Sequence, residues 1–224
     1  MISFTSGGVL PRYTKAAVFV DGSFLEMLIR ERFPGKQLSI RPFLSQILDP
    51  FNNMRSLDFM RLIRTYYYDA VPEDLSRVDS NLRERIQKKI EFLDYLEEFC
   101  NNVDVRRGFL RIGHDPDGPM KQKGVEVSMG SDMAIIAWMG KVDEIVIVGA
   151  DGDLVPAVDV AKRAMITVHL ISDARKLNPN LKKAVDTYYL NLADFVEERT
   201  LLYDPSAFTD PGALPVELSR LYHH

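Results

Sequence analysis

The chain has 224 residues, 46% hydrophobic and 27% charged, which is enough length and apolar content for a buried globular core. Its formal net charge of -4 argues against nucleic-acid binding through a bulk positive field, although it is compatible with local basic patches. The single cysteine, Cys100, excludes an internal disulfide and a multi-cysteine zinc site. Because the sequence has neither a signal-peptide pattern nor an apolar run of about 18 residues, we expect a cytoplasmic protein with no membrane contact.

Short apolar runs alternate with stretches of helical periodicity along the chain. The first run, Ala17-Val18-Phe19-Val20, is apolar without alternation, as expected of a strand that is covered on both faces. Strands are expected at residues 15–20, 59–70, 103–112, 144–149, 166–171 and 186–190. The exit of the second strand, Asp69-Ala70-Val71-Pro72, is expected to be loop-like. Helices are expected at 24–33, 42–48, 82–99, 125–139, 153–164 and 191–198, with a short helix after Asn178-Pro179 and a breaker-rich loop at 113–124.

This alternation predicts an α/β fold, a three-layer α/β/α sandwich with a mostly parallel central sheet. We expect one domain over residues 15–199, preceded by an irregular lead-in at 1–14 and followed by an irregular tail at 200–224. The tail is expected to pack either on the domain or on a partner. No internal repeat divides the chain further.

Two of the predicted strands end in acidic turns. Asp21 follows the first strand, and Asp151 and Asp153 follow the strand at 144–149. If these strands are parallel neighbours, the acids leave the sheet at the same edge, where open α/β sheets bind their ligands. Aspartates after strands are also common turn and cap residues, and Asp153 is a candidate cap for the helix that follows it.

Two further acids, Glu126 and Asp132, lie on the predicted helix at 125–139. Six residues rotate a helix by roughly 600°, so the two side chains can converge only if Glu126 lies in the approach to the helix or in its first turn. Two like charges about 4 Å apart repel by about 4 kcal/mol at an effective dielectric constant of about 20. A cluster of such acids therefore needs bound protons or a divalent cation. Oxygen ligands without histidine or cysteine suit Mg²⁺ or Mn²⁺, and such an ion suits phosphodiester hydrolysis.

Three stretches resemble the motifs of NYN-domain proteins, LabA-like branch, which belong to the PIN-like nuclease superfamily. They lie in the family's order within residues 15–195, and they are Phe19-Val20-Asp21-Gly22-Ser23, Lys123-Gly124-Val125-Glu126-Val127 with Asp132-Met133, and Gly149-Ala150-Asp151-Gly152-Asp153-Leu154. The resemblance implies a PIN-like α/β/α sandwich with an acidic Mg²⁺ or Mn²⁺ site that cuts RNA.

The resemblance also assigns roles by position. It implies five catalytic acids, Asp21, Glu126, Asp132, Asp151 and Asp153. Asp21, Asp132 and Asp151 are the implied metal ligands, and Asp153 supports Asp151. Lys123 matches a family lysine that is expected to meet a substrate phosphate or to pair with the acids.

The chain departs from the family pattern at a few positions. Phe24 stands where the family usually has asparagine, which removes an amide that could orient the metal or the phosphate. Glu126 replaces the more frequent aspartate, which keeps the charge and adds one methylene of reach. The third motif more often begins Ser-Gly-Asp and ends in phenylalanine, where this chain has Gly149-Ala150-Asp151 and Leu154. Because the acids are retained, we still expect a metal site.

Substrate contacts are expected from polar, basic and aromatic side chains near the acids. The predicted substrate-binding residues are Ser23, Lys121, Lys123 and Arg107, with Arg106 and Arg111 nearby and Tyr66-Tyr67-Tyr68 as a stacking surface for unpaired bases. Side-chain alternation sets Tyr67 opposite its two neighbours, so at least one of the three tyrosines is expected in the core.

The sequence therefore favours a Mg²⁺- or Mn²⁺-dependent ribonuclease that acts on single-stranded RNA, with association into a homodimer left open. The alternative is a non-catalytic RNA- or protein-binding module that keeps the acidic cation site. A phosphotransferase with Asp21 as its nucleophile is less favoured, because position 23 is serine rather than an acid. A dinucleotide site is excluded because neither acidic turn has G-x-G-x-x-G spacing.

Overall fold

The computed structural model describes residues 12–55, 58–72, 80–111, 121–199, 201–203, 212 and 214, with the backbone alone at 110, 111 and 121–123. In chain order the elements are β1 (Arg12–Asp21), α1 (Gly22–Arg32), β2 (Gln37–Leu38), α2 (Ile40–Gln46), α3 (Asp49–Asn52), β3 (Asp58–Pro72), α4 (Ser80–Phe99), β4 (Val103–Arg111), β5 (Lys121–Lys123), α5 (Val125–Met139), β6 (Glu144–Val148), the 3₁₀ helix η1 (Gly152–Leu154), α6 (Val155–Arg163), β7 (Thr167–Ile171), α7 (Pro179–Ala184), β8 (Thr187–Tyr189), α8 (Leu192–Glu198) and β9 (Leu202–Tyr203).

The main sheet of the described residues has seven strands in the order β5-β4-β3-β1-β6-β7-β8. Its neighbouring strands pair in parallel, except that β5 pairs antiparallel with β4. The chain builds the sheet outward from β1 toward β5 and then returns to the other side of β1 with β6, so the strand order reverses there. The predicted α/β fold with a mostly parallel sheet is confirmed, and the reversal marks the edge where such sheets bind ligands.

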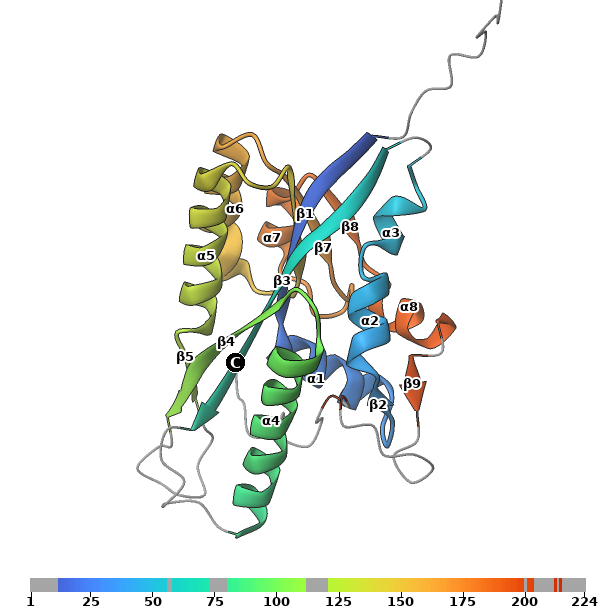
Figure 1. Cartoon of the computed structure of the whole chain (residues 1–224), viewed down its shortest axis with the longest axis vertical. Helices are drawn as coiled ribbons and strands as arrows, with labels where there is room; N and C mark the ends of the chain where they lie inside the picture. Colours follow the sequence, from blue (N-terminus) through green and yellow to red (C-terminus); the bar gives the residue numbers. More distant parts are fainter. Residues whose placement is uncertain are drawn as a thin grey trace, which may run out of the picture.

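Helices cover both faces of this sheet, with α5, α6 and α7 on one face and α1, α2, α4 and α8 on the other (Figure 1). Side chains of β1 alternate between the two cores: Val18 and Val20 pack on the α1 side, and Phe19 packs on the α5 side. Both faces of the strand are buried, which explains its apolar sequence without alternation. None of the helices in the described ranges combines the length and apolarity needed to cross a membrane.

Three strands extend beyond the predicted bounds or lie where a loop was predicted. β1 begins at Arg12 rather than at residue 15, and β3 continues through Pro72, so that Asp69-Ala70-Val71-Pro72 lies in the sheet and not in an exit loop. The β3–β4 ladder runs to the pair Pro72↔Leu110, so pairing with a neighbouring strand overrides the turn-like composition. Within the predicted loop at 113–124, residues 121–123 form β5 against β4.

Two helical segments are divided differently from the prediction. The helix expected at 42–48 is α2, which ends at Gln46 and is followed by the unpredicted α3, and the helix expected at 153–164 is η1 followed by α6. In each case the second helix has a proline in its first turn, where the missing N–H and the fixed φ favour a new start. The predicted end of α5 is confirmed, since Gly140 has φ 59 in the left-handed region.

The described positions after residue 199 pack on the domain. β9 pairs antiparallel with β2, and the backbone N–H of Leu214 donates to the carbonyl of Leu38 at 3.0 Å. Leu201 and Leu214 are buried in the same core as α1. The β2–β9 ribbon was not predicted from the sequence. It joins residues 202–203 to the segment that follows α1.

Glu144, at the start of β6, is a buried carboxylate with several hydrogen-bond donors. Arg55 Nη2 lies 2.5 Å from Oε2, His169 Nε2 lies 2.5 Å from the same oxygen, and Thr14 also binds the carboxylate. Burial raises the pKa of Glu144, but the hydrogen bonds from His169, Arg55 and Thr14 together lower it to about 2. His169 is thus a buried sheet residue, as its position in a predicted strand suggested.

Glu144 is expected to make the fold acid-sensitive. Because its pKa is lowered from 4.5 to about 2, its contribution is complete above pH 4.5 and is lost as the pH falls through 2. Glu144→Gln should lower the free energy of unfolding by about 2–3 kcal/mol at pH 7 and flatten the profile between pH 4.5 and 2. Urea unfolding at several pH values measures this, with the exposed Glu84→Gln as control. Equal pH profiles for Glu144→Gln and the unaltered chain would contradict the expectation.

Candidate functional site

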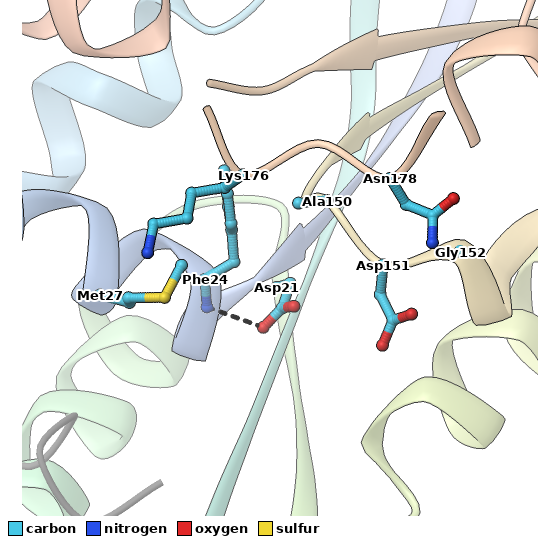
Figure 2. A pocket seen from close by; sticks show the side chains of 8 residues that line it. All are labelled: Asp21, Phe24, Met27, Ala150, Asp151, Gly152, Lys176 and Asn178. Atoms are coloured by element: carbon cyan, nitrogen blue, oxygen red, sulfur yellow. Dashed lines mark hydrogen bonds between the residues drawn. The ribbon is translucent and has the colours of Figure 1, made fainter. Parts of the chain in front are cut away.

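Two aspartates lie where β1 and β6 end side by side. Asp21 is the last residue of β1 and the N-cap of α1, and its Oδ1 accepts a hydrogen bond from the Phe24 N–H at 3.1 Å. Asp151 is the N-cap of η1, and its Oδ1 accepts from the Asp153 N–H at 2.9 Å. Because β1 and β6 pair with Val20 opposite Val148, the two strands deliver these carboxylates to the same sheet edge, at one end of a pocket (Figure 2).

The prediction that Asp153 caps the following helix is wrong. Asp151 provides the side-chain cap of η1, and α6 begins after Leu154 without a side-chain cap. Asp153 is exposed and does not line the pocket. Because η1 begins directly after Asp151, this residue, the nearer of the two acids to β6, both caps the 3₁₀ helix and lines the pocket.

Asp21 lies in a strongly negative environment. Its pKa is raised to about 7, mainly by burial and also by the carboxylates of Asp69, Glu126 and Asp151, whereas the Phe24 hydrogen bond lowers it. Among the predicted acids, Glu126 and Asp151 are thus close enough to Asp21 to raise its pKa by charge repulsion. Such an arrangement favours a proton or a cation at the mouth of the pocket.

Asp69 is an acid of this environment that the sequence analysis missed. It lies on β3, beside β1, and a Cβ added at Gly22 would come within 2.8 Å of its Oδ2. Only glycine therefore allows the first turn of α1 to approach this carboxylate so closely. The available signal was an aspartate near the carboxyl end of a predicted strand, and it was overlooked because Asp69 was assigned to a loop.

Asp69 belongs to a buried ionic group behind the site, together with Glu26 of α1 and Lys89 of α4. Lys89 Nζ lies 2.6 Å from Asp69 Oδ1 and 2.9 Å from Glu26 Oε1, and the three side chains are at most 1% exposed. Burial raises the pKa of Glu26 well above its usual value; Lys89 opposes this shift and Asp69 adds to it. This group, the Lys89 triad, packs against the same turn of α1 that carries Asp21.

Asp132 points to a different set of partners. Its Oδ2 accepts hydrogen bonds from the Tyr68 hydroxyl at 2.8 Å and from Arg106 Nε at 3.1 Å. Glu126, in the first turn of α5, is among the carboxylates that raise the pKa of Asp21. Glu126 therefore lies where the six-residue spacing still allows the two acids to converge, whereas Asp132 makes its hydrogen bonds to Tyr68 and Arg106.

The pocket beside Asp21 and Asp151 has a volume of about 400 Å³. Its remaining walls come from α1, from the turn after β6 and from the loop between β7 and α7: Phe24 and Met27, Ala150 and Gly152, and Lys176 and Asn178 (Figure 2). The sequence analysis did not assign Met27, Lys176 or Asn178 to the site. The only signal was that the β7–α7 loop follows a predicted parallel strand.

The predicted substrate-binding residues differ in burial and in the partners of their side chains. Ser23 is buried in α1, and Arg107 is bound to Asp94 and Glu97 at 2.6 and 2.9 Å. Lys121 and Lys123 lie on β5, and their side chains fall outside the described part of the chain, as does that of Arg111.

The prediction that at least one residue of Tyr66-Tyr67-Tyr68 lies in the core is confirmed. Tyr67 and Tyr68 are fully buried, so they offer no stacking surface. Tyr66 is half-buried, stacks on Phe19 with a centroid distance of 5.1 Å, and has the Arg106 guanidinium over its ring.

The donor set fits a hard divalent cation, although the carboxylates do not converge tightly. Within the described ranges, no group of three or more histidine, cysteine, aspartate or glutamate side chains lies close enough to form a ready metal cage. Asp21 and Asp151 each use Oδ1 for a cap and keep a second carboxylate oxygen. Two carboxylates with water completing the shell is the arrangement that Mg²⁺ commonly adopts.

Residues 15–193 match the NYN domain family. No curated protein sequence matches the chain. Among solved structures, the crystal structure of a protein of unknown function from Vibrio parahaemolyticus is similar, with 17% sequence identity, a TM-score of 0.52, and coverage of 80% of this chain and 93% of that chain. At this identity the similarity concerns the fold alone.

Proposed function

The chain belongs to the NYN domain family, and from this premise we propose that it is a metal-dependent ribonuclease that hydrolyses phosphodiester bonds at the Asp21–Asp151 edge. The family suggests a PIN-like nuclease. The observation that carries the proposal is the placement of Asp21 and Asp151 after the paired strands β1 and β6, at one end of the pocket. Asp21 is half-buried, and desolvation together with Asp69, Glu126 and Asp151 raises its pKa to about 7. Placing several acids together costs stability, so their retention supports a site that holds a cation.

The roles of the individual residues follow from their positions. Asp21 and Asp151 would hold Mg²⁺ or Mn²⁺ through the oxygens that are not used as caps, with Glu126 adding negative charge from α5. When bound, such an ion supplies an activated water and neutralises the charge that develops on the phosphate. Asp132, the third metal ligand expected from the family pattern, would instead orient Arg106 toward the substrate.

The main alternative is a non-catalytic module that binds RNA or protein and keeps the cation site. Phe24, which stands where the family usually has asparagine, is the feature that favours it, because the amide is missing next to Asp21. The alternative predicts cation binding without hydrolysis. The acids themselves are common to both functions.

Cleavage of a single-stranded RNA oligonucleotide by the purified chain tests the proposal. Cleavage should require Mg²⁺ or Mn²⁺, stop with a chelator, and fall at least about a hundredfold in Asp151→Asn, because this change removes a ligand oxygen's charge. Asp159→Asn, an exposed aspartate on α6, is the matched control and should cleave normally. Cation binding with no cleavage of varied RNA and DNA substrates would favour the binding module.

The remaining assignments stay predictions. We propose the LabA-like branch, single-stranded RNA rather than DNA as substrate, a cytoplasmic location, and residues 15–199 as the catalytic unit. Homodimer formation is proposed through α5, whose outward face exposes Val127, Ile135 and Trp138 by 72%, 55% and 89%. Sedimentation of the purified chain checks this association, and Trp138→Glu should weaken it.

A further inference from the structure

The pocket beside the acids has two walls of different chemistry (Figure 2). Met27, which is half-buried, and Phe24, which is 3% exposed, form an apolar wall from α1, and Lys176 and Asn178, from the β7–α7 loop, form a polar one. Its volume of about 400 Å³ lies within the range of small-ligand sites. An apolar wall facing polar groups, with carboxylates at one end, suits a flat ligand that has a polar edge and a phosphate.

We propose that this pocket is a nucleotide subsite, which receives one unpaired nucleotide adjacent to the phosphate that a cation at Asp21 and Asp151 would hold. The base lies against Met27 and the small exposed part of Phe24, and its edge faces Asn178. This inference rests on the proposed nuclease function and extends it by assigning a subsite to the substrate and a role to Phe24. Phe24, which stands where the family usually has asparagine, thereby supplies an aromatic contact to a base.

Asn178 is held in a suitable orientation for this role. Its Oδ1 accepts the Asn180 N–H at 2.8 Å, and its backbone N–H donates to the Ala150 carbonyl at 3.0 Å. The side chain packs against the Gly152 backbone so closely that a Cβ at position 152 would collide with its amide. Because Oδ1 is occupied, Nδ2 remains to donate to an acceptor on the base.

Lys176 supplies positive charge at the rim. Its ammonium lies 2.9 Å from Glu31 Oε2, and both side chains are more than a third exposed. An exposed pair of this kind contributes little to stability, so the ammonium can turn from Glu31 to a phosphate at little cost. This charge partly offsets the repulsion between the substrate backbone and the acids.

The subsite also restricts the class of substrate. A base that is paired and stacked in a duplex can enter a pocket of this kind only after it leaves the stack, which costs a few kcal/mol. An unpaired nucleotide does not incur this cost. The pocket therefore favours single-stranded nucleic acid at the point of cleavage.

Mononucleotide binding to the full chain tests the subsite independently of hydrolysis. With Mg²⁺ present, calorimetry or NMR titration compares uridine 5′-monophosphate with ribose 5-phosphate, which lacks the base. We expect the nucleotide to bind about tenfold more tightly, and Phe24→Leu to remove most of this difference while ribose 5-phosphate binding is unchanged. Phe43→Leu is the matched control, since Phe43 is buried in the same core but does not line the pocket.

Equal binding of the two ligands would overturn the subsite, as would equal effects of Phe24→Leu and Phe43→Leu. Asn178→Ala, which lies outside the core but also removes the side-chain cap of α7, gives a second measurement and should weaken nucleotide binding but not ribose 5-phosphate binding. Base-dependent binding without RNA cleavage would retain the subsite and overturn the nuclease function. RNA cleavage without base-dependent binding would do the reverse.

Discussion

Replacing Lys89 by methionine is expected to lower the free energy of unfolding by about 3–5 kcal/mol. The substitution keeps an unbranched side chain of similar length but removes the only cation of the Lys89 triad. Glu26 and Asp69, which lie 2.9 and 2.6 Å from the ammonium, would then be left buried without a counter-charge. Urea unfolding at pH 8 measures the loss. The loss should shrink at pH 5, because protonation of the carboxyls relieves it.

Two comparison variants separate charge from packing at this position. Lys88→Met changes the neighbouring residue on α4, whose ammonium is exposed and paired with Glu84 at 3.2 Å, so its effect should stay below about 0.5 kcal/mol. Combining Lys89→Met with Glu26→Gln and Asp69→Asn should recover much of the stability, because the unpaired charges are gone. A triple variant no more stable than Lys89→Met would assign the loss to packing instead.

Asp21→Asn is expected to abolish RNA cleavage and, without metal, to stabilise the fold. The pKa of Asp21 is raised from 3.8 to about 7, so the folded state binds the proton more tightly than the unfolded chain does. The stability of the unaltered chain therefore falls as the pH rises from about 4 to about 7. At pH 8 the amide should raise the free energy of unfolding by about 1–3 kcal/mol, and it retains an oxygen to accept the Phe24 N–H.

Thermal or urea unfolding, with and without Mg²⁺, checks this trade-off between stability and function. Added Mg²⁺ should stabilise the unaltered chain and leave Asp21→Asn unchanged, because only the carboxylate favours the cation. Asp159→Asn should behave like the unaltered chain in both measurements. If Asp21→Asn were less stable than the unaltered chain at pH 8, the crowding of negative charge at β1 would be disproved.

The edge of the sheet illustrates how much of the site the sequence could predict. The apolar runs that end at Asp21 and Asp151 are local patterns, and parallel pairing carries both acids to one side. The family motifs add Glu126, which the structure places near Asp21. These residues lie at element ends that periodicity alone identifies.

The rest of the site depends on contacts between segments far apart in the sequence. Asp69 joins it because β3 pairs with β1, and Asn178 joins it because the β7–α7 loop packs on Gly152. Strand neighbours and loop paths are not encoded in any local pattern. Asp132 is a converse case, since the helix rotation turns it toward Tyr68 and Arg106.

The sequence by itself determined the layered α/β fold, because the spacing of apolar residues records which faces are buried. It also determined that acids follow β1 and β6. The tertiary structure alone decided strand order, the placement of Phe24, Lys176 and Asn178 around one pocket, and the buried Lys89 triad behind Asp21. The physical reason is that burial leaves a local periodic trace, whereas a meeting of charges depends on how distant segments pack.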